Sequence, residues 1–178
     1  QRVTAEAAIE RLDSFDAVID ARSESEFAED RLPGARNWPS LNDTERAEIG
    51  TLYKQVSAFE ARKRGAVLVA RNIARHVEQH VVNPAPGLSR EWSPLVYCWR
   101  GGQRSGSLAT VLDAIGIRTH VLEGGYREFR RAVLADQGAG GRTTAVSLNS
   151  AVPSGTWRVR IFTDPKGSSV GETTFMVE

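Results

Sequence analysis

Cysteine is almost absent from this chain. Cys98 is the only cysteine among 178 residues. One cysteine can form neither an internal disulfide nor a cysteine-rich zinc site, so both are excluded. A lone reactive thiol suits a reducing compartment, and we therefore expect a cytoplasmic protein without a metal site.

The chain also lacks a large net charge and a long apolar run. Its 23 basic and 22 acidic side chains leave a formal net charge of +1, so any contact with RNA would need a local patch. No apolar stretch approaches the roughly 18 residues of a membrane span, and the first residues show no signal-peptide pattern. We therefore expect no membrane partner, although a chain that begins with Gln1 can be a fragment.

Apolar runs and helical spacing alternate along the first three quarters of the chain. The expected strands are 15–20, 95–97 and 119–122. The expected helices are 4–12, 23–28, 42–54, 66–80, 105–115 and 126–134. This alternation predicts an α/β fold with a parallel sheet flanked by helices.

The composition changes after Asp136. We expect a domain over residues 1–136, a glycine-rich linker over 137–142, and a short β-prone C-terminal tail over 143–178. The tail is too short to bury a core of its own, so we do not expect it to be an independent domain.

Cys98 ends an apolar strand and begins a loop rich in glycine and arginine. The loop continues as Trp99, Arg100, Gly101, Gly102, Gln103, Arg104 and Ser105, and a helix follows. Loop amides and a helix N-terminus favour negative charge at the centre of such a loop, and the two arginines add positive charge. We therefore expect Cys98 to act as a thiolate nucleophile and the loop to bind anions.

Further segments outside the cysteine loop form recognisable motifs. They are Asp20-Ala21-Arg22, Glu26-Phe27, Leu32-Pro33-Gly34-Ala35, Asn37-Trp38-Pro39, residues 41–54 and Leu122-Glu123-Gly124-Gly125-Tyr126. Together with residues 98–105, these segments resemble rhodanese-type sulfurtransferase domains, and the match is closest to the rhodanese domain of the tRNA 2-selenouridine synthase family. The resemblance covers about residues 3 to 135.

The resemblance implies a specific chemistry. That family replaces the sulfur of 2-thiouridine at the tRNA wobble position with selenium, using selenophosphate, through a geranylated intermediate. Cys98 would then carry the chalcogen as a persulfide or perselenide, and the loop amides with Arg104 would stabilise the anion. Arg100 would face either phosphate or tRNA. The implied substrates are tRNA and selenophosphate (or another sulfane donor), with no bound cofactor.

Three residues near the loop have supporting roles in this interpretation. Asp20 and Arg22 are expected to form a structural ion pair beside the site. Glu123 is expected either to accept hydrogen bonds from the loop amides or only to form a turn.

The sequence departs from the family after the rhodanese-like part. Nothing in it fits the phosphate-binding motif of the family's second domain. Residues 154–178 instead resemble, over a short stretch, a β-sandwich segment of bacterial α2-macroglobulin-like proteins, which would fit a fused or misassembled reading frame. We therefore expect a partial enzyme.

Other functions stay open at this stage. The segment from Cys98 to Arg104 has the Cys-x5-Arg spacing of cysteine phosphatases, although no general acid is evident. A generic thiosulfate sulfurtransferase and a non-catalytic binding module are further alternatives. Arg62, Lys63, Arg64, Arg71 and Arg75 form either a tRNA-facing patch or an ordinary charged helix face.

The histidines and tryptophans complete the set of candidates. His76 and His80 are one helical turn apart, a spacing that permits metal binding, but no carboxylate or cysteine supports it, so we expect a solvated helix face. We expect Trp38 and Trp92 to pack in the core and Trp99 to be exposed at the loop.

Overall fold

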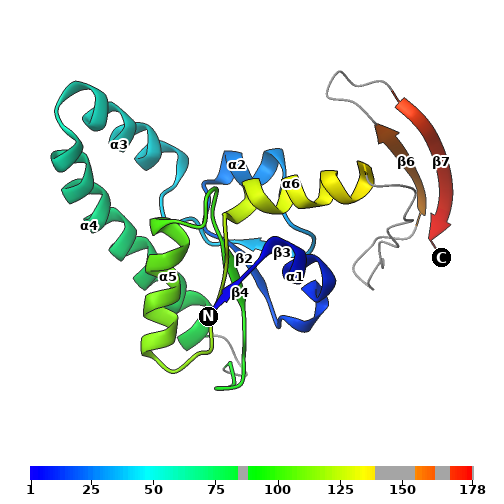
Figure 1. The fold of residues 1–178 in the computed structure, drawn as a ribbon. Coiled ribbons are helices and arrows are strands. Elements are labelled where there is room, and N and C mark those ends of the chain that lie inside the picture. Colours follow the sequence, from blue (N-terminus) through cyan, green and yellow to red (C-terminus); the bar gives the residue numbers. More distant parts are fainter. Residues whose placement is uncertain (84–87, 139–154, 163–168, 178) are drawn as a thin grey trace. The chain divides into compact units, whose positions relative to one another are not determined.

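The computed structural model describes residues 1–83, 88–138, 155–162 and 169–177 (Figure 1). The chain divides into two compact units, residues 1–141 and 142–178. The first contains a parallel sheet of five strands in the order β1-β5-β4-β2-β3. These strands are β1 (Arg2–Val3), β2 (Val18–Asp20), β3 (Ala35–Asn37), β4 (Leu95–Tyr97) and β5 (His120–Leu122). The expected α/β architecture with a parallel sheet is confirmed.

Helices connect the strands. They are α1 (Ala5–Glu10), α2 (Glu24–Glu29), α3 (Asp43–Gln55), α4 (Ala58–Val77), α5 (Gln103–Ala114) and α6 (Gly125–Gly138), with a 3-10 turn at Leu12–Ser14 and a π-helical turn at Glu78–Val82. Helix α4 begins eight residues before the expected helix 66–80, because the side chain of Ser57 accepts a hydrogen bond from the amide of Glu60 and caps it there.

The central strands are buried on both faces, which explains their continuous apolar sequence. Ile19 of β2 and Val96 of β4 pack with residues of α4 and α5, such as Ile73 and Leu108. The residues next to them along the strands, such as Leu95, point to the opposite face and pack against α1 and α6. The alternation of side chains along each strand therefore distributes the core over two layers of helices.

The second unit contains an antiparallel pair, β6 (Gly155–Phe162) and β7 (Ser169–Val177). Residues 139–154 lie outside the described residues, so the expected domain boundaries stay a prediction. Helix α6 includes Gln137 and Gly138, the first two residues of the expected linker.

Candidate active site

Cys98 follows the last residue of β4, which is the middle strand of the sheet. The strands are parallel, so their carboxyl ends meet at one edge, where loops of α/β proteins commonly form sites. Strand β2 ends there at Asp20, and β5 is followed there by Glu123. The topology thus brings Cys98 and two of the three expected supporting residues to the same edge.

The Cys98 sulfur is buried and receives a side-chain hydrogen bond. Only 3% of the residue is exposed, and the Ser105 hydroxyl donates to Sγ over 3.2 Å. Ser105 lies in the first turn of α5 and is itself buried. A donor aimed at sulfur stabilises the thiolate relative to the thiol.

Among the described residues, no acceptor is found for the amides from Trp99 to Ser105. The N-cap of α5 is Gly102, and no side chain caps this helix end. These amides and the α5 N-terminus therefore remain available to bind a negative charge.

Two glycines fix the shape of this loop. Gly101 and Gly125 have φ angles of 64° and 63°, and a Cβ atom on Gly125 would lie 2.1 Å from the Cys98 carbonyl oxygen. The amide of Tyr126 donates to the same carbonyl over 2.8 Å. The first turn of α6 therefore holds the loop in place, and only glycine permits the close approach.

The expected ion pair between Asp20 and Arg22 is present and buried. Arg22 Nη2 lies 2.7 Å from Asp20 Oδ2, and their side chains are 2% and 0% exposed. Burial alone would lower the pKa of Arg22, but the hydrogen bond and charge of Asp20 raise it. The guanidinium also lies over the ring of Tyr126, 4.1 Å from its centroid. The amide of Tyr126 in turn donates to the Cys98 carbonyl, so contacts connect the ion pair to the start of the loop.

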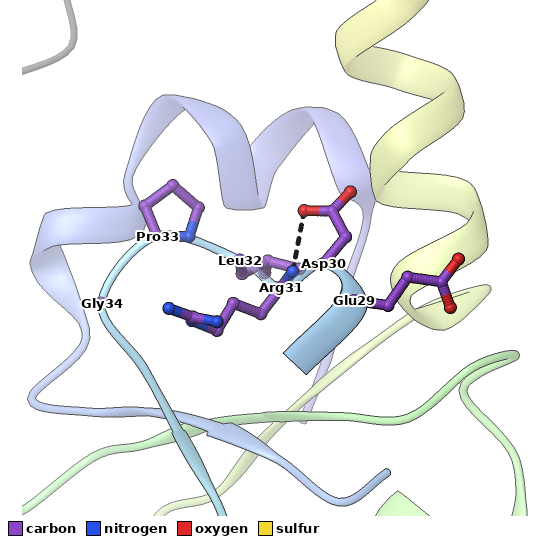
Figure 2. Close-up of a pocket in the computed structure, with 6 residues that line it drawn as sticks. All are labelled: Glu29, Asp30, Arg31, Leu32, Pro33 and Gly34. Carbon is purple, nitrogen blue, oxygen red and sulfur yellow. Dashed lines mark hydrogen bonds between the residues drawn. The ribbon is translucent and has the colours of Figure 1, made fainter. Parts of the chain in front are cut away.

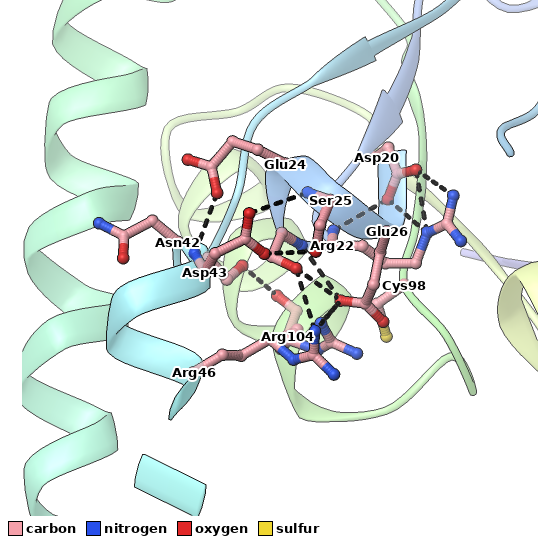
Figure 3. A network of polar contacts seen from close by, with 12 residues as sticks. Asp20, Arg22, Glu24, Ser25, Glu26, Asn42, Asp43, Arg46, Cys98 and Arg104 are labelled. Carbon is pink, nitrogen blue, oxygen red and sulfur yellow. Dashed lines mark hydrogen bonds and ion pairs between the residues drawn. The ribbon is translucent and has the colours of Figure 1, made fainter. Parts of the chain in front are cut away.

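Arg104 is paired with a carboxylate from α2. Its Nη1 atom donates to Glu26 Oε2 over 2.8 Å, and Arg46 of α3 lies 3.3 Å from the same oxygen (Figure 3). Burial favours the neutral form of Glu26, but Arg104, Ser23 and Arg46 together hold its pKa below the usual value. The Arg104 guanidinium therefore has a charged partner in Glu26, which it shares with Arg46.

The remaining loop residues are mostly solvent-exposed. Trp99 is 37% exposed, as expected, and its ring lies 5.6 Å from that of Tyr126. Arg100 and Gln103 are exposed as well, and Arg100 has no ion-pair partner among the described residues. The amide of Glu123 donates to Val3, while its side chain makes no hydrogen bond within the described part of the chain.

The expectation for His76 was wrong. His76 is buried, its Nε2 atom lies 3.1 Å from the Pro39 carbonyl, and its ring stacks on Trp38. His80, which is exposed, stacks on Trp38 too. Trp38 and Trp92 are buried, as expected. In the described ranges no group of three or more potential metal ligands occurs.

A surface depression lies in the loop between α2 and β3 (Figure 2). It is lined by residues 29–34, and the amide of Arg31 donates to Asp30 Oδ1 there over 2.8 Å. None of the expected site residues lines it, and we assign no function to it.

Sequence reasoning placed Glu26 in a family signature but missed its contact with the loop. The available signal was the spacing of Ser23 and Glu26, which is typical of a capping box. The structure contains this box at the start of α2. The cap orients the Glu26 carboxylate, which then reaches Arg104.

Comparisons with known proteins identify relatives of this chain. The chain is 35% identical over 118 residues to a tRNA 2-selenouridine synthase of Nitrosomonas europaea, and 37% identical over 117 residues to that of Proteus mirabilis. Each match covers 66% of this chain but only 30% and 32% of the relative, respectively. The chain thus spans about a third of the length of these relatives.

A solved structure shows the same fold. The N-terminal domain of a protein from Clostridium difficile 630, described as an ATP/GTP binding protein, is 33% identical with a TM-score of 0.60. The match covers 75% of this chain and 99% of that one.

Across the described residues, no helix has the length and apolar character needed to cross a membrane. The model of the rhodanese-like domain matches residues 4–132, and the chain therefore belongs to the rhodanese-like domain family.

Proposed function

We propose that Cys98 carries sulfur or selenium for the conversion of 2-thiouridine to 2-selenouridine at the tRNA wobble position. One observation carries this proposal. The buried Cys98 sulfur accepts a hydrogen bond from Ser105, and Cys98 is the first residue of a loop whose amides have no acceptor in the described structure. A terminal persulfide or perselenide anion at that position would be stabilised by several aligned donors. Each donor typically contributes about 3 kcal/mol in such sites.

The loading step follows from the thiolate. With thiosulfate as donor, Cys98 attacks the outer sulfur, a sulfur–sulfur bond forms, and sulfite leaves with the bonding electron pair. Selenophosphate holds its selenium at the selenide level, so it acts on the loaded persulfide: the selenium attacks Cys98 Sγ, hydrosulfide leaves, and water then cleaves the Se–P bond to release phosphate. The step needs no resident cofactor, and selenophosphate enters as a substrate.

We propose tRNA as the partner, and the names of the relatives support this choice. Arg71 and Arg75 of α4 are exposed, and Asn72 lies between them. The Asn72 side chain donates to the Ser40 carbonyl, and the Ser40 hydroxyl donates to the Arg104 carbonyl in the active-site loop. We expect replacement of both arginines by glutamate to weaken tRNA binding and to lower its salt dependence. Arg118, exposed near the opposite edge of the sheet, provides the matched control, and an equal effect of Arg118→Glu would contradict this assignment.

We also propose that this chain performs only part of the reaction. It spans about a third of its named relatives, and it contains no phosphate-binding glycine motif. We therefore expect chalcogen loading without complete selenation. Detection of 2-selenouridine in tRNA treated with this chain, selenophosphate and geranyl diphosphate would contradict the partial role.

Intact-mass spectrometry tests the loading step directly. After incubation with thiosulfate the wild-type protein should gain one sulfur atom, subsequent selenophosphate should replace it by one selenium atom, and a reducing agent should remove either. The Cys98→Ser variant should gain nothing in either case. If wild type stays unmodified by both donors, the proposed function is wrong.

The Cys-x5-Arg spacing supports a phosphatase as the second candidate. A phosphatase loop needs its arginine to contact the phosphoryl oxygens, whereas Arg104 is bound to Glu26. Turnover of an aryl phosphate that disappears in Cys98→Ser would favour this alternative over chalcogen transfer.

A further inference from the structure

Three apolar side chains are exposed where α3 turns into α4. Tyr53, Val56 and Phe59, which we call the hairpin tip, are 60%, 63% and 65% exposed. The two helices form a hairpin that projects from the sheet, and the tip lies at its far end (Figure 1). Exposed apolar side chains that are grouped rather than scattered indicate a binding surface.

The charge of this hairpin favours one kind of partner. Residues 43–77 carry seven basic and four acidic side chains, whereas the rest of the chain carries 16 basic and 18 acidic ones. Lys54 and Arg62, which flank the tip in sequence, are exposed and have no carboxylate partner within the described residues. The hairpin is thus the positive part of a nearly neutral chain and is suited to a polyanion.

A ridge of exposed side chains leads from the tip along α4. Its members, spaced by four residues, are Phe59, Lys63, Val67, Arg71 and Arg75. Side chains four apart on a helix are neighbours, and Lys63 Nζ lies 5.0 Å from the centre of the Phe59 ring. At the other end Arg75 donates to Asn72, which donates to Ser40 beside the active-site loop. The ridge therefore connects this loop with the tip.

Aromatic rings next to cations are typical of surfaces that bind single-stranded nucleic acid. Bases stack on the rings, and the phosphates contact lysine and arginine. The wobble nucleotide of a tRNA lies in the anticodon loop, whose unpaired bases can be splayed out onto a protein. In a duplex stem the bases are stacked and paired with each other, so a ring has nothing to stack on.

We infer that the α3–α4 hairpin binds unpaired nucleotides of the anticodon loop, with bases stacked on Tyr53 and Phe59 and phosphates held along the ridge. The inference rests on the proposed function for the choice of tRNA. It gives two aromatic rings a role in substrate binding that chalcogen loading of Cys98 does not need.

Fluorescence anisotropy with a labelled anticodon stem-loop RNA tests the inference. Phe59→Leu and Tyr53→Leu keep an apolar side chain but lose the ring, and each should weaken binding about tenfold, as expected for one stacked base. The blunt stem without its loop should bind equally to wild type and to both variants. Phe59→Leu should leave the salt dependence of the affinity unchanged, whereas Lys63→Gln should reduce it.

Val56→Ala is the matched control, because Val56 lies at the same tip and has no ring. It should bind the stem-loop as wild type does. An equal loss of binding in Val56→Ala would overturn the inference, since the tip would then act through apolar contact rather than stacking. A wild-type dimer that Phe59→Leu dissociates in analytical ultracentrifugation would also overturn it, by assigning the tip to a second copy of the chain.

The inference is wrong if neither leucine variant weakens binding of the stem-loop. If joint replacement of Arg71 and Arg75 by glutamate still weakens binding in that case, tRNA remains the partner and only the stacking role fails. The binding assay uses no chalcogen donor, so labelling of Cys98 tests the proposed function separately. Both leucine variants should be labelled by thiosulfate as wild type is.

Discussion

The Ser105 hydroxyl lies 3.2 Å from Cys98 Sγ and 3.3 Å from the Gly102 carbonyl oxygen, and Ser105→Ala removes both contacts. In Ser105→Ala we expect alkylation of Cys98 at neutral pH to slow several-fold, because loss of the 3.2 Å hydrogen bond removes a donor that stabilises negative charge on the sulfur.

Ser107 offers a control for that measurement. It lies on the same helix, and among the described residues its hydroxyl makes no hydrogen bond. Ser107→Ala should therefore react at the wild-type rate. An unchanged rate in Ser105→Ala would show that the backbone amides alone set the reactivity.

Arg22 illustrates how much one buried charge depends on its partner. Arg22→Met should lower the free energy of unfolding by about 3–5 kcal/mol, because it leaves the buried Asp20 side chain without its charged partner. Urea denaturation measures this, and adding Asp20→Asn to Arg22→Met should restore part of the loss.

An exposed ion pair provides the comparison. Lys63 and Glu60 are 54% and 46% exposed, and Lys63→Met should change the free energy of unfolding by less than about 1 kcal/mol. Equal effects of Arg22→Met and Lys63→Met would mean that the Asp20–Arg22 pair has no special structural role.

At the scale of elements, the turn between β5 and α6 controls the shape of the active-site loop. Gly125→Ala should destabilise the protein by at least about 1–3 kcal/mol and impair labelling of Cys98 by thiosulfate. Its Cβ would overlap the Cys98 carbonyl, and φ of 63° disfavours alanine.

Gly106 is the matched glycine for this prediction. It lies inside α5, and a Cβ atom there would meet nothing within 4 Å. Gly106→Ala should therefore stabilise the protein by up to about 1 kcal/mol, since alanine favours the helix. If both variants unfold at the same urea concentration, the prediction that close packing at Gly125 excludes a side chain is wrong.

The sequence predicted the elements that carry strong apolar patterns. The strands at Leu95–Tyr97 and near Val18–Asp20 were expected because both of their faces are buried. The edge strands β1 and β3 were missed. They contain two and three residues, and β3 reads Ala-Arg-Asn, without a β-branched or aromatic side chain. Such strands are stabilised by backbone pairing with a neighbour, which a local pattern does not reveal.

The site was predicted only partly, for a similar reason. Cys98 and its loop are contiguous in sequence, so their chemistry was recognisable from residue types and spacing. The partner of Arg104 is distant in sequence, and it reaches the loop because β2 pairs with β4 and positions α2 beside α5. Contacts that depend on strand order are not encoded in local spacing.

At the scale of the whole molecule, the buried histidine couples stability to pH. The Pro39 carbonyl can only accept, so the Nε2 atom of His76 carries the proton, and Nδ1 is buried without a partner among the described residues. Burial lowers the pKa of His76, and the nearby charges of His80 and Arg75 lower it further. Trp38 covers the ring, and only Glu24 and the Pro39 carbonyl act in the opposite direction.

The sign of the resulting pH dependence follows from linkage. Histidine in the unfolded chain takes up a proton below about pH 6.5, whereas folded His76 resists it until lower pH. Unfolding therefore binds protons, and the free energy of unfolding falls as the pH drops below about 6.5. The lowered pKa of Glu26 adds a second loss below about pH 4.5, when its carboxylate is protonated on unfolding.

Urea denaturation between pH 7.5 and pH 5.5 tests this prediction. The free energy of unfolding should fall toward the acidic end, and His76→Gln should make the slope shallower, because glutamine can still donate to Pro39 but does not titrate. His80 and His120 also have lowered pKa values, mainly through partial loss of solvent around the ring, so the slope should shrink rather than vanish. A slope that is identical in wild type and His76→Gln would mean that His76 is not the main acid-sensitive group, and that the stacked Trp38–His76 packing tolerates the charge.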